Sequence, residues 1–288
     1  MPETTSSGGG LREAVEHERP VQVLGAVNAC AAIMAERLGA RALYLSGAGV
    51  ANASFGLPDL GFTTLENVCE DARRISAVTR VPLLVDADTG WDDPGESVAA
   101  LAAAGAAGCH LEDQVSAKRC GHRPGKALVP TAEMVARLET AGKGRPGPAF
   151  VLMARTDAAA SEGLGAAIDR ANAYVAAGAD MIFAEALTDL DSFRRFADEV
   201  PVPVLANMTE FGTTPMHTAG DFGAAGIALV LYPLSAFRSM NKAAENTYRT
   251  ILATGSQQDV LDGMQTREEL YEYLDYHDAE AEQDRRRI

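Results

Sequence analysis

Eight short runs of apolar, mostly β-branched residues recur along the chain, separated by helical patterns. The runs are Val21–Ala26, Ala42–Ser46, Pro82–Asp86, Gly108–Glu112, Phe150–Arg155, Asp180–Glu185, Val202–Asn207 and Gly226–Tyr232. Alanine-rich amphipathic stretches predict helices between them, at Leu65–Val78, Glu96–Ala104, Thr131–Thr140, Leu164–Ala177, Asp189–Glu199 and Phe237–Ala253. Repeated strand–helix units favour an α/β fold with a closed (β/α)₈ barrel of the TIM type. A doubly wound open sheet is the alternative, but this sequence lacks the glycine fingerprint that such a fold has after its first strand.

The barrel accounts for most of the chain and leaves a segment at each end. We predict a disordered leader over residues 1–10, the barrel over 11–255 and a helical extension over 256–288. The extension contains helical patterns at Asp259–Met264 and from Arg267 to about Asp284, which is more helix than eight repeats need. Surplus terminal helices predict an oligomer, with a helix that caps its own barrel as the alternative.

Charge and cysteine content exclude several classes of function. The formal net charge of −15 opposes binding to nucleic acid or to an anionic membrane surface. Four cysteines without CxxC spacing indicate neither a disulfide framework nor a zinc site. The N-terminus lacks a signal-peptide pattern and no apolar run is long enough to span a bilayer, so we expect a cytoplasmic protein.

Polar side chains follow six of the predicted strands at the point where each strand ends. They are Ser46-Gly47, Asp86-Ala87-Asp88, Glu112-Asp113, Arg155-Thr156-Asp157, Glu185 and Asn207-Met208-Thr209-Glu210. The active site of a barrel of this kind is built from the carboxyl ends of its strands, so these groups are expected to converge on one rim. Ordinary turn chemistry does not explain so many charged groups at one edge.

Asp86, Asp88 and Glu112 predict a metal site on this rim. Asp86 and Asp88 are two residues apart and project to the same side of an extended chain. Oxygen-rich sites of one or two carboxylates suit Mg²⁺, with Mn²⁺ as a substitute, and leave positions for a substrate carboxylate and hydroxyl. The alternative is that Asp86 and Asp88 cap the helix that begins near Pro94.

The segment 113–130 is long for a strand–helix loop and reads as a lid. It contains four basic residues, two glycines, His122 and Cys120. Its cationic surroundings are expected to lower the pKa of the Cys120 thiol, which could then exchange a proton near neutral pH. An exposed cysteine in a solvated basic loop and a redox sensor are the alternatives.

Arginine and neutral donors complete the set of candidate ligands for an anionic substrate. Arg155, Arg238 and Arg267 can bind carboxylates by two parallel hydrogen bonds. The neutral donors are Ser46, the Gly47 amide, Asn207 and Thr209. Arg238 and Arg267 lie in helical sequence, where a solvated surface position is the alternative.

These residues resemble the isocitrate lyase/phosphoenolpyruvate mutase superfamily and, within it, the short bacterial 2-methylisocitrate lyases. The resemblance runs from about Leu24 to Tyr276. It is carried by YLSGAGVANASFGLPDLGFTT (residues 44–64), DADTG (86–90), HLEDQVSAKRCGHRPGKA (110–127), MARTDA (153–158), NMTEFG (207–212), LYPLSAFR (231–238) and MQTREELY (264–271). HLEDQ together with KRCGHR is the most specific of these motifs.

The resemblance implies a function for most residues on the rim. It implies that Asp86 and Asp88 hold Mg²⁺ with Glu112 in the outer shell, and that Cys120 is an acid/base, with His122 beside it. It implies substrate contacts from Ser46, Gly47, Ala48, Gly121, Arg155, Glu185, Asn207, Met208, Thr209, Arg238 and Arg267. It also implies a homotetramer or dimer, in which a neighbouring subunit exchanges the last barrel helix.

The expected reaction cleaves a di- or tricarboxylate, with 2-methylisocitrate giving pyruvate and succinate as the preferred candidate within propionate catabolism (the methylcitrate cycle). Tyr44, Asp59 and Glu112 are the candidate initiating bases, and the sequence does not choose among them. Isocitrate or dimethylmalate lyase, oxaloacetate hydrolase, phosphonomutase and a non-catalytic carboxylate-binding barrel are the alternatives.

Two departures from the family pattern bear on substrate binding. Ala48 stands where the family has the second glycine of Ser-Gly-Gly, and its methyl group disfavours a positive φ angle. Trp91-Asp92-Asp93 follows DADTG in place of an aromatic residue and glycine. We expect these departures to affect substrate preference more than the fold.

Overall fold

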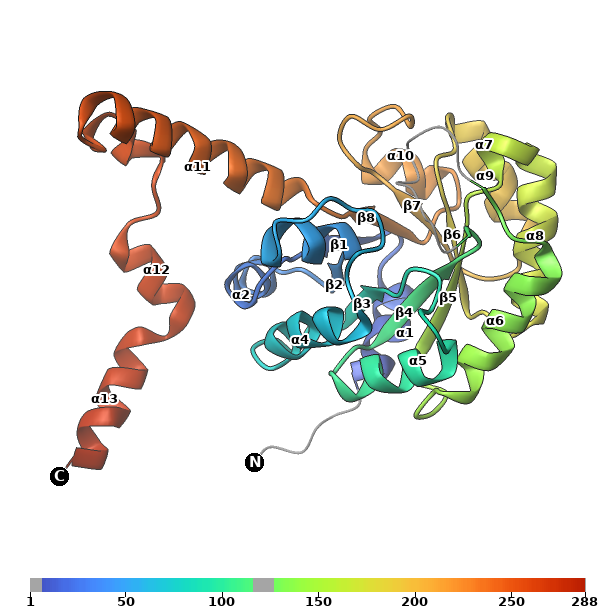
Figure 1. Ribbon diagram of the computed structural model, residues 1–288, viewed down its shortest axis with the longest axis horizontal. Helices are drawn as coiled ribbons and strands as arrows, with labels where there is room; N and C mark the ends of the chain where they lie inside the picture. The colour runs from blue at the N-terminus through green and yellow to red at the C-terminus, as the bar shows by residue number, and fades with distance from the viewer. Residues whose placement is uncertain (1–6, 116–126, 288) are drawn as a thin grey trace.

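The chain folds into a closed barrel of eight parallel strands (Figure 1). The computed structural model describes residues 7–115 and 127–287. Each strand pairs with the next in the sequence, and β8 closes the ring against β1. The strands are β1 (Val21–Gly25), β2 (Ala42–Leu45), β3 (Leu83–Asp86), β4 (Gly108–Glu112), β5 (Val151–Thr156), β6 (Met181–Ala184), β7 (Val204–Asn207) and β8 (Leu229–Tyr232). The predicted (β/α)₈ barrel is confirmed, and every predicted run overlaps its strand.

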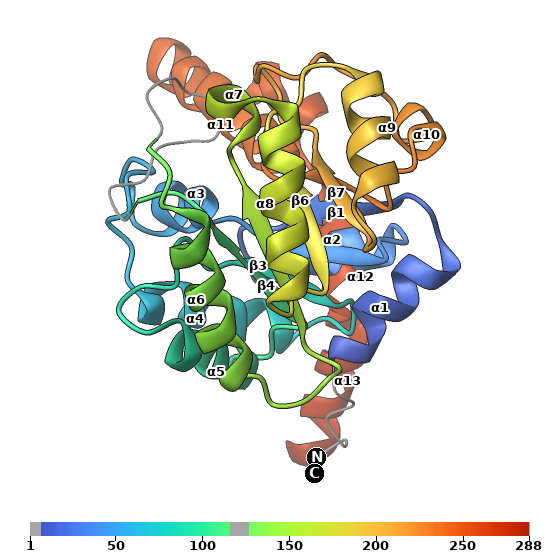
Figure 2. The same cartoon turned by 90° about the vertical axis from the view of Figure 1, so that its right-hand side faces the viewer.

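Helices surround the strands (Figure 2). In chain order they are α1 (Ser7–His17), α2 (Ala29–Arg37), α3 (Gly47–Gly49), η1 (Val50–Ser54), α4 (Leu65–Ser76), α5 (Pro94–Ala103), α6 (Thr131–Lys143), α7 (Ala159–Glu162), α8 (Leu164–Ala176), α9 (Leu190–Glu199) and α10 (Ala219–Ala224), followed by α11 (Ser235–Thr254), η2 (Gln258–Gly263), α12 (Arg267–Leu274) and α13 (Tyr276–Arg287). Local signals set where they begin: Thr64 and Asn67 form a capping box before α4, and Asp189 accepts from Ser192 N before α9.

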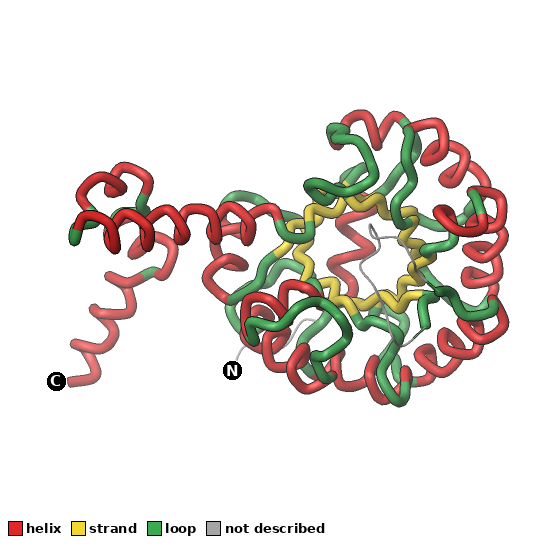
Figure 3. The backbone as a smooth tube through the Cα atoms, turned by 45° about the horizontal axis from the view of Figure 1, so that its top comes forward, coloured by secondary structure: helices red, strands yellow, loops and turns green. Residues whose placement is uncertain are grey.

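The core has two layers, one inside the barrel and one between the strands and the helices. Helix α1 closes the lower end of the barrel (Figure 3), where Leu11 and Val15 share one helix face and are fully buried. The leader predicted for residues 1–10 therefore overlaps α1 from Ser7 onward. Residues 1–6 lie outside the described part of the chain.

The C-terminal segment departs from the barrel. Helix α11 runs outward from β8 and none of its residues is buried (Figure 1). Beyond it, α12 lies against α2, where Arg37 Nη1 donates to the Glu272 carbonyl oxygen at 2.6 Å. The single helix predicted from Arg267 to about Asp284 is two helices, because Asp275 adopts a left-handed conformation with φ of 49° and ends α12. In the described residues, no helix is both long and apolar enough to cross a membrane.

Candidate active site

The carboxyl ends of the strands gather the predicted polar groups on one rim. Neighbouring strands place Asp86 beside His110, and Glu112 beside Arg155. Asp86, Asp88, Glu112, Arg155, Glu185 and Asn207 are each exposed by no more than 8% of their surface. The structure thus brings together side chains from five strands, as the parallel arrangement predicts.

The first part of the rim is a pair of carboxylates at the end of β3. Asp86 Oδ2 accepts from the Gly47 amide at 3.1 Å, and Asp86 Oδ1 accepts from the Asp88 amide at 3.1 Å. A β-carbon placed on Gly47 would lie 3.2 Å from both Asp86 Oδ2 and Asp88 Oδ1, so both oxygens face the same space beside Gly47 and a side chain there would crowd them. Asp88 holds a positive φ of 49°, the kind of backbone strain that clusters at functional sites.

The helix-capping alternative for this pair is wrong. Asp93 is the residue that caps α5, and its Oδ1 accepts from Gly95 N at 2.7 Å and from Glu96 N at 3.0 Å. The departure Trp91-Asp92-Asp93 therefore supplies the cap. Trp91 also donates from Nε1 to the Thr63 carbonyl oxygen at 3.1 Å, which fixes the loop after β3. Asp86 and Asp88 therefore do not cap α5, and their carboxylates belong to the rim.

The donor chemistry of the pair fits a hard divalent cation. Carboxylate oxygens with water are the ligands that Mg²⁺ takes, and one or two protein carboxylates are enough because the ion keeps several waters. In residues 7–115 and 127–287, no three His, Cys, Asp or Glu side chains group closely enough to hold an ion by themselves. Asp86 and Asp88 by themselves would leave most coordination positions of such an ion to water and substrate. Glu112, the third residue of the predicted metal site, instead lies next to Arg155.

Beneath the carboxylate pair, His110 links Tyr44 to Asp86. The Tyr44 hydroxyl is 2.8 Å from His110 Nε2, and that nitrogen is 3.7 Å from Asp86 Oδ1. The His110 ring stacks on Tyr44 and meets the edge of Phe183. Burial raises the pKa of Tyr44 well above its ordinary value, and the nearby charge of Asp86 adds to this. Tyr44 in this setting keeps its proton.

The second part of the rim surrounds Arg155 with carboxylates. Asp157 accepts from Arg155 Nε at 2.9 Å and from Nη2 at 3.1 Å. Glu112 Oε2 lies 3.5 Å from Nε, and Glu185 Oε2 lies 3.4 Å from Nη2. Burial by itself would lower the pKa of Arg155, but Asp157, Glu185 and Glu112 outweigh it and raise the pKa well above the ordinary value. Arg155 is therefore a permanently charged group held in one orientation.

Residues after β6 and β7 border Arg155. Asn207 Nδ2 lies 3.4 Å from Glu185 Oε2, and Thr209 is half-buried at the edge of the rim. Met208, a predicted substrate contact, is instead fully buried in the layer between strands and helices, and its amide donates to the Leu231 carbonyl oxygen at 2.7 Å. Its side chain faces the core because successive residues of a strand alternate between faces.

Ser46 and Ala48 lie where β2 passes into α3. Ser46 is buried and precedes the helix as its N-cap residue. Ala48 lies inside α3 and is absent from the residues with positive φ, so alanine there meets no backbone strain. The expected conformational penalty for this departure is therefore wrong.

Three other predicted residues are not among the buried residues of the rim. Asp59 is half-buried in the loop between η1 and α4. Arg238, in the first turn of α11, lies over the Phe211 ring at 5.7 Å and has its Nε 3.4 Å from Glu210 Oε2. Arg267 is exposed at the start of α12, so this chain does not bring it to the rim. Arg267 is distant from the rim because α11 runs outward and carries α12 away from the mouth of the barrel (Figure 1).

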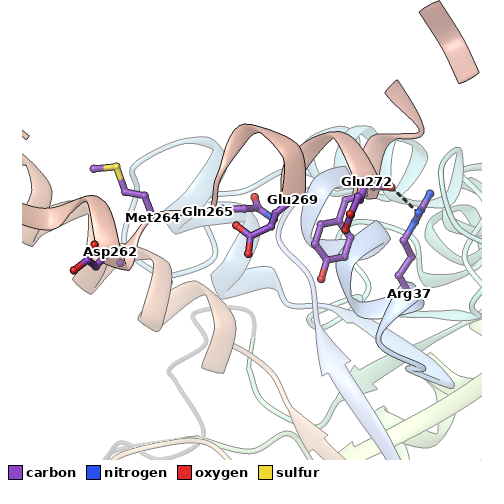
Figure 4. Close-up of a pocket in the computed structure, with 8 residues that line it drawn as sticks. Arg37, Asp262, Met264, Gln265, Glu269 and Glu272 are labelled. Atoms are coloured by element: carbon purple, nitrogen blue, oxygen red, sulfur yellow. Dashed lines mark hydrogen bonds between the residues drawn. The ribbon is translucent and has the colours of Figure 1, made fainter. Parts of the chain in front are cut away.

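Cys120, Gly121 and His122 lie outside the described residues, together with residues 116–126 of the predicted lid. The two flanks of that segment pair with each other, since Val115 N donates to Ala127 O at 3.0 Å. A separate groove of about 580 Å³ lies between α2 and the C-terminal segment (Figure 4) and is lined by Arg37, Met264, Gln265, Glu269 and Glu272 among others. It is remote from the rim in the fold.

Sequence reasoning placed Asp113 and Asp157 at the strand ends without giving them a role, and it missed His110. Asp157 binds Arg155, Asp113 accepts from the Asp157 amide at 2.9 Å, and His110 links Tyr44 to Asp86. Strand alternation could have found His110, because it lies two residues from Glu112 on β4.

Comparison with known proteins identifies the family of this chain. The family model described as phosphoenolpyruvate phosphomutase matches residues 11–252. The 2-methylisocitrate lyase of Salmonella typhimurium is 54% identical over 97% of this chain and 96% of its own length, and that of Escherichia coli is 53% identical over the same shares. The solved structure of a 2,3-dimethylmalate lyase superposes with a TM-score of 0.89 at 30% identity, covering 96% of this chain and 94% of that one. The predicted enzyme class, a carbon–carbon lyase, is confirmed, and the chain belongs to the phosphoenolpyruvate phosphomutase family.

Proposed function

We propose that this enzyme is a Mg²⁺-dependent lyase that cleaves 2-methylisocitrate to pyruvate and succinate. The observation that carries the proposal is a rim with two different halves, the converging oxygens of Asp86 and Asp88 and the clamped guanidinium of Arg155. The relatives named 2-methylisocitrate lyase, which match along almost the whole chain, support this choice of substrate.

The charge balance of the rim supports the need for a cation. Five buried carboxylates surround the rim, namely Asp86, Asp88, Glu112, Asp157 and Glu185. Among the described residues, the buried arginines are Arg155 and Arg170, and Arg170 lies outside the rim on α8. A tricarboxylate is itself anionic, so a site that holds it beside these carboxylates needs cationic groups. Held by Asp86 and Asp88, Mg²⁺ would offset that charge and polarise the substrate oxygens.

Arg155 is the group that binds a substrate carboxylate. Asp157 takes the N–H groups of Nε and Nη2, and Nη1 makes no hydrogen bond to a described residue. That nitrogen remains for an anionic ligand, and charge-assisted bonds of this kind are strong. The Phe183 ring lies 5.0 Å beneath the guanidinium carbon. Asn207, beside Glu185, adds a neutral amide donor.

Cleavage transfers two protons around one bond. A base takes the proton of the C2 hydroxyl, the C2–C3 bond breaks, and its electron pair stays on C3 of the succinate fragment. Cys120 then donates a proton to that carbon, with His122 and the basic residues of its loop stabilising the developing charge. Of the candidate bases, Tyr44 keeps its proton because burial raises its pKa, whereas Glu112 and Asp59 are carboxylates. Tyr44 is better suited to donating a hydrogen bond to the hydroxyl oxygen.

The test is a coupled assay that follows pyruvate and glyoxylate separately, on the full chain with and without EDTA. We expect pyruvate and succinate from 2-methylisocitrate, no release under EDTA, and recovery when Mg²⁺ or Mn²⁺ is added back. Faster cleavage of isocitrate or 2,3-dimethylmalate would move the enzyme to a related activity. Absence of cation-dependent release from any of them would favour a carboxylate-binding barrel or a thiol sensor.

We also propose that the enzyme assembles as a homotetramer or dimer in the cytoplasm. Helix α11 exposes Tyr248, Ile251 and Leu252, and none of its residues is buried. Apolar side chains along one helix favour cover by another subunit, and exchange of α11 would provide it. Such an exchange would also bring Arg267, which follows α11, toward a neighbouring rim, while Arg238 in the first turn stays with its own barrel. Sedimentation of the purified chain tests the assembly, and a monomer at micromolar concentration would contradict it.

A further inference from the structure

We propose that Tyr174 and Arg170, on the outer helix α8, are positioning residues for Arg155. They act through a continuous set of hydrogen bonds that passes through Asp113 and Asp157. This inference rests on the proposed role of Arg155 as the carboxylate-binding group. It assigns a function to residues that lie one layer away from the rim.

The set begins at the carboxylate of Asp113, which is fully buried at the end of β4. Its Oδ2 accepts from the Tyr174 hydroxyl at 2.9 Å and from the Thr156 hydroxyl at 2.7 Å. Arg170 Nη1 lies 3.7 Å from the same oxygen and donates to the Tyr174 oxygen at 3.2 Å. A buried carboxylate is stable only when donors surround it, so Tyr174 and Arg170 fix where Asp113 lies.

Asp113 in turn fixes the residues that hold Arg155. Its Oδ1 accepts from the Asp157 amide at 2.9 Å, and its own amide donates to the Arg155 carbonyl oxygen at 3.2 Å. Asp157 is fully buried and grips the guanidinium by two parallel hydrogen bonds. Displacement of Asp113 would therefore move both the main chain of Arg155 and the carboxylate that orients its side chain.

Arg170 is itself held in place from two sides. Glu162, at the end of α7, accepts from its Nε and Nη2 at 2.7 Å each. Arg170 Nη1 also donates to the Val129 carbonyl oxygen at 2.9 Å, while Val129 N donates to Asp113 O at 2.9 Å. Helices α7 and α8, the end of β4 and Val129 thus form one hydrogen-bonded unit behind Arg155. Such supporting groups usually decide how accurately a binding residue is aimed.

The experiment compares Tyr174→Phe with Ile168→Val in the full-length enzyme. Tyr174→Phe removes one hydroxyl and keeps the ring, whereas Ile168→Val removes a buried methylene from the same helix without touching the network. We measure KM and kcat for 2-methylisocitrate, and succinate binding by calorimetry, well below each melting temperature. Because Arg155 contributes to binding before and during cleavage, Tyr174→Phe should raise KM and the succinate Kd about five- to tenfold with kcat nearly unchanged. Ile168→Val should leave all three near wild type.

A double-mutant cycle with Arg155→Lys shows whether Tyr174 acts through Arg155. In the Arg155→Lys background, Tyr174→Phe should weaken succinate binding by less than twofold. A full five- to tenfold increase in the succinate Kd in that background, or equal effects of Tyr174→Phe and Ile168→Val, would overturn this inference and leave the proposed function standing. If wild type neither cleaves 2-methylisocitrate nor binds succinate, the proposed function falls and the inference falls with it.

Discussion

The two halves of the rim differ in how their carboxylates are used. At the end of β3, Asp86 and Asp88 turn oxygens toward the space beside Gly47, where an added β-carbon would lie only 3.2 Å from each. Around β5, Glu112, Asp157 and Glu185 instead surround the guanidinium of Arg155. The same residue type therefore serves opposite purposes on neighbouring strands.

The difference shows that the role of a carboxylate on this rim depends on where it lies. Carboxylates that converge on one point attract a cation, whereas carboxylates that enclose an arginine orient it and keep it charged. A tricarboxylate that bridges the halves would place its oxygens against the cation on one side and its remaining carboxylate against Arg155 on the other. Asp88→Asn and Arg155→Gln should each disturb one half and leave the other intact, whereas Cys120→Ser and Ala48→Gly should leave both halves intact.

The largest effect is expected from Asp88→Asn, which removes one of the two converging carboxylates. We expect kcat/KM for 2-methylisocitrate to fall by about 10³-fold or more, because polarisation by a bound cation is worth several kcal/mol. Steady-state kinetics over a wide range of Mg²⁺ concentrations measures this loss. Asp92→Asn, in the exposed loop before α5, is the matched control. Near-normal activity of Asp88→Asn would contradict the assignment of this half.

Cys120→Ser should lower turnover without weakening the binding of ligands to either half of the rim. The thiol is proposed to donate the final proton, so kcat should fall by about 10²- to 10⁴-fold while Mg²⁺ and succinate still bind. Cys30→Ser is the control, because Cys30 lies in α2 outside the rim. Pyruvate release measures turnover, and a Cys120→Ser variant that keeps most of its activity would remove the residue from the mechanism.

Arg155→Gln should weaken substrate binding at the arginine half of the rim, with a somewhat smaller effect on activity than Asp88→Asn or Cys120→Ser. Loss of a charge-assisted contact to a carboxylate costs about 1.5–3 kcal/mol, so KM should rise by roughly 10- to 150-fold. The enclosing carboxylates lose their partner, and a lower melting temperature is expected as well. Arg195→Gln, which breaks an exposed pair with Glu199 on α9, is the control for the loss of an arginine. An unchanged KM would show that Arg155 does not bind substrate.

The smallest effect is expected from Ala48→Gly. Ala48 lies in α3 without a positive φ, so restoring the family's glycine relieves no strain. We expect kcat and KM to stay within about twofold of wild type and the melting temperature to fall slightly, because glycine loses more backbone freedom on folding. A tenfold gain in kcat/KM would instead show that the methyl group crowds the substrate.

The barrel could be predicted because its signals are local. Strands buried on both faces read as continuous apolar runs, and the residues after each strand necessarily meet on one rim. That reasoning placed Asp86, Glu112 and Arg155 correctly at neighbouring strand ends. It also left a capping role open for Asp86 and Asp88, since only the fold shows that Asp93 takes that position.

The remaining features depend on contacts between distant segments. Asp113 and Tyr174 are 61 residues apart, and nothing in the local sequence of either shows that they meet. The exposed position of Arg267 follows from the direction of α11, which the local sequence does not show. Helix α1 begins in a glycine-rich stretch typical of disorder, yet Leu11 and Val15 bury one of its faces against the barrel. In α1, tertiary burial outweighs local propensity.

Calorimetric titration of Mg²⁺ into wild type, Asp88→Asn and Arg155→Gln tests the division of the rim most directly, because it needs no turnover. Wild type and Arg155→Gln should bind one ion per chain with Kd values within about threefold of each other, and Asp88→Asn should bind at least about 100-fold more weakly. Equal binding by Asp88→Asn and wild type, or loss of binding in Arg155→Gln to the same extent as in Asp88→Asn, would contradict the account.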